Sequence, residues 1–206
     1  MGGANIGKYS LLATKTLPNT KIIAFEPVKK TFKNLTKNVE GKTNITLVNC
    51  GLFSSECTKE INLFNSNTHS SLYDSQGVNY SVNDKIAIQL ITGDSYLEEQ
   101  NINQVDFLKI DIEGAEYDAL LGLEKALQKG AIKAIQFEYG YINLSSKNLL
   151  GDFYSLLESH NYVLGKIYPK RVDFRKYLRK HEDFIGPNFI AVHKSEKILI
   201  EHLGKE

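Results

Sequence analysis

Apolar residues along the chain fall either in short continuous runs or at helical spacing, and the two patterns alternate. The apolar runs predict strands at residues 21–26, 45–49, 86–91, 105–111, 131–139, 162–167 and 189–193. Helical spacing predicts helices at residues 6–15, 28–38, 117–128 and 149–159. The polar segment 60–84 is expected to form short strands and loops. Alternating strands and helices predict an α/β fold, with a mostly parallel sheet and helices on both faces.

Residues 105–117, Val-Asp-Phe-Leu-Lys-Ile-Asp-Ile-Glu-Gly-Ala-Glu-Tyr, join an apolar strand to a cluster of carboxylates. Asp111, Glu113 and Glu116 fall at or beyond the carboxyl end of this strand. Ligands of open α/β sheets bind outside the carboxyl ends of strands, so the cluster indicates a functional site. The alternative is a set of solvated turn acids beside a helix N-terminus, which favours negative charge.

A second motif is the small-residue loop Gly3-Ala-Asn5-Ile-Gly7, which precedes a predicted helix. The strand that follows ends at Glu26, about 20 residues past the glycines, which is the spacing of a ribose-binding carboxylate in a nucleotide fold. Loop, helix, strand and acid together predict a nucleoside-binding half. An ordinary βαβ crossover remains the alternative, since glycines are common in turns.

These motifs, in this order and spacing, resemble the FkbM-type methyltransferases. The residues that carry the resemblance are Gly-Ala-Asn-Ile-Gly at 3–7, Ala-Phe-Glu-Pro at 24–27 and Asp-Phe-Leu-Lys-Ile-Asp-Ile-Glu-Gly-Ala-Glu at 106–116. Weaker similarities occur at 67–72, 92–94, 137–138 and 188–192, so the resemblance extends to about residue 194. It implies a Rossmann-like class I fold, S-adenosylmethionine as cofactor, and methylation of a hydroxyl group.

Composition fits one domain over residues 1–206, because 42% apolar residues can bury one substantial core. A net charge of +1 gives no general attraction to nucleic acid or membrane, and no apolar run approaches the ~20 residues that span a bilayer. Cys50 and Cys57 are too few for a disulfide framework, and no zinc-ligand spacing occurs. We expect a cytoplasmic protein without a resident metal, and the oligomeric state stays open.

The resemblance also predicts a central strand that leads directly into the glycine loop. Met1 and Gly2 would take its last positions, between the strands at 21–26 and 105–111. Loss of the rest would leave two rows of backbone groups unpaired, at about 1–3 kcal/mol each. We expect a truncated or mis-started reading frame; otherwise the neighbouring strands close the gap or another segment fills it.

The resemblance implies a cofactor-binding role for seven residues: Gly3, Asn5, Gly7, Glu26, Leu52, Phe53 and Asp111. The loop would approach the methionine and ribose portions, Glu26 would accept hydrogen bonds from the ribose hydroxyls, and Leu52 and Phe53 would contact the adenine. Asp111 would lie near the transferred methyl group.

Asp111 and Glu113 are also candidate catalytic residues, and Glu113 and Glu116 could bind the acceptor or pair with Lys109. His69 is the first candidate for the general base, since imidazole titrates near neutral pH. An exposed loop histidine is the alternative. A divalent metal bridging Asp111 and Glu113 is a further hypothesis, because hard cations prefer carboxylates, although no full ligand set is visible.

The three arginines of the chain, Arg171, Arg175 and Arg179, are spaced four residues apart. If this segment is helical, they share one face. Arginine binds phosphate or carboxylate in a bidentate manner, so the stripe suggests an anionic acceptor, such as a nucleotide sugar or glycan. A solvated basic helix is the alternative.

Three functions remain open from the sequence. The leading hypothesis is an O-methyltransferase that acts on a sugar, glycan or related small molecule. The second is a methyltransferase relic that binds the cofactor without turnover. The third is an RNA or nucleotide methyltransferase, but the Asp-Ile-Glu-Gly sequence at 111–114 lacks the Asn/Asp-Pro-Pro-aromatic loop of base methylation. No stable nucleic-acid partner is therefore expected.

Overall fold

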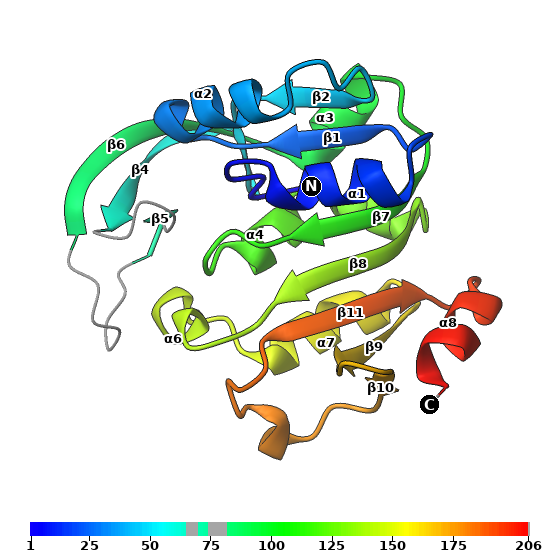
Figure 1. Ribbon diagram of the computed structural model, residues 1–206. Coiled ribbons are helices and arrows are strands. Elements are labelled where there is room, and N and C mark those ends of the chain that lie inside the picture. Colours follow the sequence, from blue (N-terminus) through cyan, green and yellow to red (C-terminus); the bar gives the residue numbers. More distant parts are fainter. Residues whose placement is uncertain (65–69, 74–81, 206) are drawn as a thin grey trace.

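The chain forms two sheets in a computed structural model, which describes residues 1–64, 70–73 and 82–205 (Figure 1). The strands of the larger sheet are, in chain order, β1 (Ile22–Phe25), β2 (Ile45–Val48), β7 (Val105–Ile110), β8 (Ile132–Glu138), β9 (Tyr162–Ile167), β10 (Val172–Phe174) and β11 (Asn188–His193). All but β10 lie where the apolar runs predict strands. The prediction of an α/β fold is confirmed.

The larger sheet is mixed, so the prediction of a mostly parallel sheet was wrong. β1 pairs with β2 and β7 pairs with β8 in parallel, but β11 lies between β8 and β9 and runs antiparallel to both. The reason is the route of the chain. Asn188, the first residue of β11, lies opposite Glu138, the last residue of β8, so the chain enters β11 at the edge where β8 ends.

Gly2 connects the two halves of this sheet. It forms parallel bridges with Phe25 of β1 and with Ile110 of β7. Its N–H donates to the Lys109 carbonyl at 2.8 Å, and its carbonyl accepts from the Asp111 N–H at 3.3 Å. The position predicted for residues 1–2 is therefore confirmed. In the described residues β1 and β7 do not pair directly, so neighbouring strands do not close the gap.

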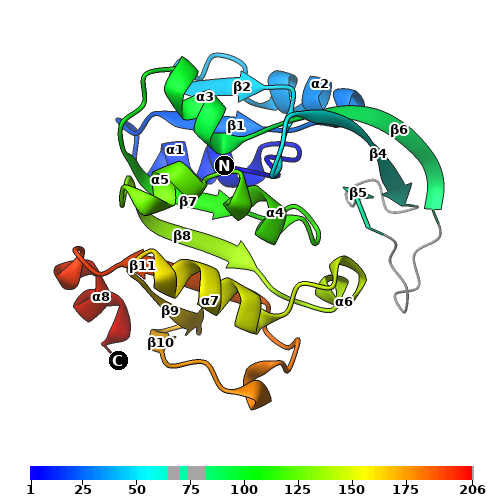
Figure 2. The same cartoon turned by 180° about the vertical axis from the view of Figure 1, so that it is seen from behind.

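Helices cover both faces of the larger sheet, as predicted (Figures 1 and 2). One face carries α1 (Lys8–Thr16), α2 (Lys29–Asn38) and α8 (Lys197–Gly204). The other carries α3 (Gly93–Glu99), α4 (Glu116–Leu121), α5 (Glu124–Gln128) and α7 (Leu150–Ser159). The main core lies between this second group of helices and the sheet, where the Phe137 and Phe153 rings stack with centroids 4.8 Å apart. No described helix has the length and apolar character needed to cross a bilayer.

The helix predicted at 117–128 is two short helices, α4 and α5, separated at Gly122 and Leu123. A Cβ built at Gly122 would lie 2.0 Å from the carbonyl oxygen of Phe53. The backbone therefore passes directly over the chain that leaves the smaller sheet, and Leu123 packs against Gly93 of α3. Apolar periodicity continues through this break, which is why the sequence predicts one helix.

The smaller sheet extends beyond the carboxyl ends of β1, β7 and β8 (Figure 1). Its order is β3 (Gly51–Leu52), β6 (Val82–Ile91), β4 (Cys57–Phe64) and β5 (Ser70–Ser71), and β4 and β6 form a long antiparallel pair. The prediction of short strands and loops at 60–84 was therefore only partly correct. Ser71 of β5 and Tyr73 after it contact the turn and the helix that follow β7.

Gly3 is the position where the fold tolerates a side chain least. Its φ is +73°, and a Cβ would lie 1.8 Å from the Asp111 carbonyl oxygen. Gly41 has a similar φ, +77°, but no atom within 4 Å of such a Cβ. Gly41→Ala should therefore lower the unfolding free energy only by the cost of a left-handed backbone, about 1 kcal/mol.

We expect Gly3→Ala to lower the unfolding free energy by about 3 kcal/mol or more, because the clash adds to the same backbone cost. Urea denaturation of the two variants and the wild type measures the difference. Equal losses in the two variants would show that the approach of Gly3 to Asp111 does not constrain the fold.

Candidate functional site

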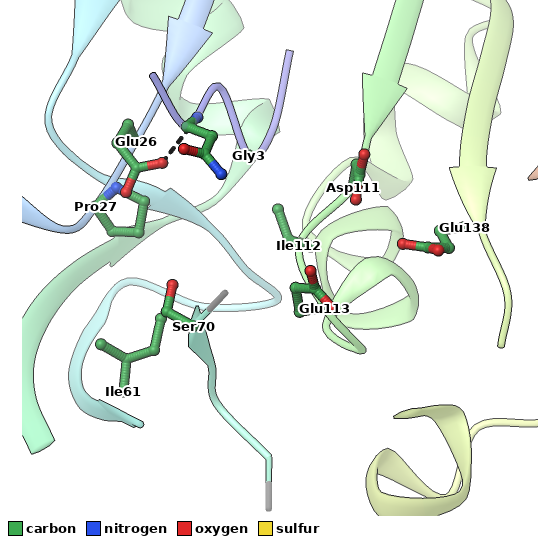
Figure 3. A pocket seen from close by; sticks show the side chains of 10 residues that line it. Gly3, Glu26, Pro27, Ile61, Ser70, Asp111, Ile112, Glu113 and Glu138 are labelled. Atoms are coloured by element: carbon green, nitrogen blue, oxygen red, sulfur yellow. Dashed lines mark hydrogen bonds between the residues drawn. The ribbon is translucent and has the colours of Figure 1, made fainter. Parts of the chain in front are cut away.

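A cavity of about 390 Å³ lies outside the carboxyl ends of β1, β7 and β8 (Figure 3). Ten residues line it: Gly3, Asn5, Glu26, Pro27, Ile61, Ser70, Asp111, Ile112, Glu113 and Glu138. Five of these, Gly3, Asn5, Glu26, Asp111 and Glu113, are site residues predicted from the sequence. The structure therefore brings the glycine loop, the first acidic strand end and the acidic turn together at one opening.

Glu26 forms one wall of the cavity. Glu26 is only 6% exposed, and burial raises the pKa of its carboxyl group. Two backbone donors oppose this effect: Asn5 N–H donates to Oε2 at 3.0 Å and Val28 N–H donates to Oε1 at 2.9 Å. An ionised carboxylate can accept about four hydrogen bonds, so two acceptor positions remain for a ligand.

The loop at residues 3–7 holds Glu26 in place and brings backbone to the cavity. Asn5 has a left-handed φ of +51°, and its side-chain oxygen accepts from the Ile6 N–H at 2.7 Å. Gly7 lies away from the cavity lining. A Cβ at Gly7 would meet Leu35 of α2 at 2.7 Å, so this glycine allows α1 and α2 to pack closely.

The acidic turn after β7 is held by the buried carboxyl group of Glu116. Its two oxygens accept from Ile112 N–H at 2.8 Å and from Gly114 N–H at 2.9 Å. This supports the positive φ angles of Glu113, +56°, and Gly114, +104°. Glu116 is 1% exposed, and burial raises its pKa to about 8. Glu116 therefore positions the turn from its buried side. The sequence analysis had instead predicted that Glu116 binds the acceptor or pairs with Lys109.

Asp111 lies in the cavity with a basic partner. Its carboxylate accepts from the Lys109 Nζ at 2.5 Å, and Lys109 also lies over the Tyr9 ring at 5.3 Å from the centroid. Asp111 keeps 44% of its side chain exposed, whereas Lys109 keeps 13%. The ammonium group thus offsets part of the negative charge in the cavity while Asp111 stays accessible.

Glu138, which the sequence analysis did not select as a site residue, lies beside Asp111 in the cavity wall (Figure 3). It is the last residue of β8, the neighbour of β7. Burial, followed by the charges of Asp111 and Glu113 and a hydrogen bond with Asp111, raises the pKa of Glu138 to about 7. The rule that located Asp111, an acid at the carboxyl end of an apolar strand, would also have located Glu138.

The smaller sheet closes the side of the cavity that lies opposite the larger sheet. Ser70 of β5 and Ile61 of β4 line it, and Ser71 Oγ donates to the Glu113 carbonyl at 2.6 Å. Tyr73 Oη donates to Asp118 of α4 at 2.5 Å. These contacts anchor β5 and Tyr73 to the acidic turn and to α4.

Several predicted site residues lie elsewhere. Leu52 and Phe53 are buried in two separate core clusters and do not line the cavity. Arg171, Arg175 and Arg179 do not share a helix face, because the segment consists of β10, extended chain and a short 3-10 helix (Arg179–His181). Arg175 pairs with Asp173 at 3.3 Å. His69 lies outside the described residues.

In the part of the chain described by the structure, no group of three or more His, Cys, Asp and Glu side chains is arranged to hold a metal ion. The cavity is instead asymmetric in its polar groups. Glu26 and the loop backbone lie at one end, and the Lys109–Asp111 pair with Glu138 lies at the other. This arrangement suits a nucleoside at the first end and proton transfer at the second.

Comparison with known proteins identifies a matching family and related sequences. The profile of the methyltransferase FkbM domain matches residues 2–164. Methyltransferase 1 of Beauveria bassiana is 29% identical over 140 residues, covering 59% of this chain and 56% of that protein. The hexuronic acid methyltransferase AglP of Haloferax volcanii is 25% identical over 174 residues, covering 80% of this chain and 68% of that protein.

The fold is also similar to that of a solved structure. The methyltransferase FkbM from Methylobacillus flagellatus KT superposes with a TM-score of 0.56 at 16% identity, covering 92% of this chain and 42% of that chain. At this identity the similarity supports the fold alone. The chain thus spans only part of the length of its relatives.

Glu116 makes stability depend on pH. Its raised pKa means that the folded protein keeps a proton that the unfolded chain releases above about pH 4.5. The stability that this group contributes is full below that pH and is lost as pH rises toward about 8.

We expect Glu116→Gln, which cannot titrate, to show a smaller fall in unfolding free energy between pH 5 and pH 8 than the wild type. Glu138 titrates in both proteins, so the difference between the two curves comes from Glu116 and its charge interaction with Glu138. Parallel pH curves from urea denaturation would contradict the assignment of a buried, protonated Glu116.

Proposed function

The chain belongs to the methyltransferase FkbM domain family, and on that premise we propose that it is an S-adenosylmethionine-dependent O-methyltransferase. The acceptor would be a hydroxyl group of a sugar, a glycan or a related small molecule. The observation that carries the proposal is the cavity itself. A nucleoside-type carboxylate, Glu26, and a carboxyl group suited to accept a proton, Glu138, line the same opening.

The residues at the Glu26 end fit the cofactor. Two acceptor positions on the Glu26 carboxylate remain after its bonds to Asn5 and Val28, and a ribose presents two hydroxyl donors. The cavity volume of about 390 Å³ lies within the range of small-molecule sites. Gly3, without a side chain, lets the backbone approach a ligand closely. Bound there, the cofactor would supply an electrophilic methyl group, which leaves its sulfur as the acceptor oxygen bonds to it.

The chain's own task at the other end is to take the proton from the acceptor hydroxyl. Glu138 lines the cavity on the acceptor side, and its raised pKa makes it a stronger base than an ordinary carboxylate. We assign it the role of general base, a role for which His69 was the first candidate from the sequence.

Asp111 and Glu113 would position the acceptor. Asp111 is held by Lys109 at 2.5 Å, so its orientation is fixed beside Glu138. Carboxylates accept hydrogen bonds, which favours an acceptor rich in hydroxyl donors. Relatedness to a protein named as a hexuronic acid methyltransferase supports a sugar acceptor in the same way.

Glu26→Gln tests the cofactor site. We expect it to weaken S-adenosylmethionine binding about 10- to 100-fold, since hydrogen bonds to a charged group contribute about 1.5–3 kcal/mol. Isothermal titration measures the affinity, and urea denaturation shows whether the variant remains folded. Glu98→Gln, at an exposed position on α3, is the matched control. A folded Glu26→Gln variant with wild-type affinity would remove the nucleoside assignment.

Glu138→Gln tests the chemistry. We expect kcat to fall at least about 100-fold, the usual contribution of a general base, while cofactor affinity stays unchanged. The assay is transfer of labelled methyl to glucose, galactose, glucuronic acid and galacturonic acid. In the wild type, kcat/KM should rise with pH through about 7, because Glu138 must be ionised to accept the proton.

That rise should be lost in Glu138→Gln and kept in Glu98→Gln. A Glu138→Gln variant that keeps the wild-type rate and pH profile would contradict the role of Glu138. Binding of S-adenosylmethionine without transfer to any hydroxyl compound would favour the relic over the enzyme.

A further inference from the structure

Positive charge is concentrated in the first part of the chain, although the whole chain is nearly neutral. Residues 1–44 contain eight lysines and two acids, whereas residues 45–206 contain 17 basic and 22 acidic residues. One of the two acids, Glu26, is buried in the cavity wall. Seven of the lysines are exposed on α1, on α2 and just after α2, and we call them the basic face: Lys8, Lys15, Lys29, Lys30, Lys33, Lys37 and Lys42.

The two helices that carry the basic face lie on the same side of the larger sheet (Figure 1). They are in contact, because Asn38 at the end of α2 donates from its side-chain amide to the Ile6 carbonyl at 2.8 Å. Lys29, Lys33 and Lys37 are four residues apart, so they lie along one line of α2. In the part of the chain that the structure describes, no lysine of the basic face forms a salt bridge. These charges are therefore available to an anionic partner.

Exposed leucines lie among these lysines. Leu12 of α1 is 60% exposed, and it lies on the same side of the helix as Lys8 and Lys15, which are four residues before it and three after it. Leu17, directly after α1, is 57% exposed. Apolar surface left in water is a source of free energy for any partner that buries it. The surface thus combines positive charge with apolar side chains.

A hollow of about 460 Å³ lies between α2 and β2 and opens on the basic face. It is lined by residues of α2, of the turn that follows and of β2: Lys33, Thr36, Lys37, Val39, Glu40, Lys42, Ile45 and Leu47. Three of its residues are lysines and three are aliphatic. Such a lining suits a molecule with an anionic head and an apolar body.

We propose that the basic face binds the surface of an anionic phospholipid bilayer, with a lipid headgroup in the hollow beside α2. This inference goes beyond the proposed function and does not depend on methyl transfer. Clusters of lysine are attracted to anionic headgroups. The apolar stems of the lysines, with Leu12 and Leu17, can pack at the boundary between headgroups and acyl chains. The chain would lie on the bilayer without crossing it.

Nucleic acid is the other large polyanion that such charges attract. Its phosphates are commonly bound by the planar fork of arginine, and residues 1–44 contain no arginine. Leu12 and Leu17 would also stay against a polar sugar-phosphate backbone, where they gain little from burial. A bilayer uses both the lysines and the leucines, which is the reason to favour it.

The test is sedimentation of the folded chain with vesicles of phosphatidylglycerol and phosphatidylcholine, and with vesicles of phosphatidylcholine alone. We expect binding to the anionic vesicles only, and its loss at high salt, which screens surface charge. Lys29→Gln, Lys33→Gln and Lys37→Gln together should weaken binding about 100-fold, because each lysine near an anionic surface contributes about five-fold. The control carries the same loss of charge at exposed lysines of β6 and α5: Lys85→Gln, Lys125→Gln and Lys129→Gln. It should bind nearly as the wild type does.

The leucines distinguish a bilayer from other polyanions. Leu12→Gln and Leu17→Gln together should weaken vesicle binding about ten-fold, since they remove apolar surface that the bilayer buries. Poly(U) and polyglutamate, titrated in parallel, should bind more weakly than the anionic vesicles.

A folded wild type that does not bind the anionic vesicles would overturn the inference, as would equal losses in the two triple variants. Tighter binding of poly(U) or polyglutamate, unchanged by the leucine substitutions, would overturn it in favour of a nucleic acid or an acidic polypeptide.

Discussion

The approach of the Gly3 backbone to the Asp111 carbonyl is the constraint on which the rest of the site depends. Gly2 bonds to Lys109 and Asp111 on one side and bridges Phe25 on the other. The loop that follows holds Glu26, and the strand it touches, β7, leads directly into Asp111. A side chain at residue 3 would separate these two walls. One short backbone segment therefore places the Glu26 carboxyl group opposite the acidic end of the cavity.

The acidic end is compatible with a stable fold because the cost of its negative charges is reduced in a different way at each carboxyl group. Glu116 is buried beneath the turn, and burial raises its pKa to about 8 while two backbone N–H groups bind its oxygens. Lys109 offsets the charge of Asp111 at 2.5 Å. Glu138 is left with a raised pKa between Asp111 and Glu113. Crowding of carboxylates, which is costly for folding, thus produces a group suited to take a proton near neutral pH.

Much of this could be predicted from the sequence, because strand ends and glycine loops follow local rules. Apolar runs located the strands, and the motif spacing located Gly3, Asn5, Glu26 and Asp111. Features set by tertiary packing could not be predicted in this way. The break at Gly122 depends on the Phe53 carbonyl, the direction of β11 depends on the chain's route, and Leu52 and Phe53 are taken up by the core. Glu138 was missed although the rule that found Asp111 applies to it.

The most direct test of the central claim, that the loop, Glu26 and the ends of β7 and β8 form one cofactor and acceptor site, is a crystal structure with S-adenosylhomocysteine. We expect the ribose hydroxyls to donate to the Glu26 carboxylate, inside the cavity lined by Gly3, Asn5 and Asp111. A nucleoside bound at any other place, or a ribose without contact to Glu26, would contradict the claim.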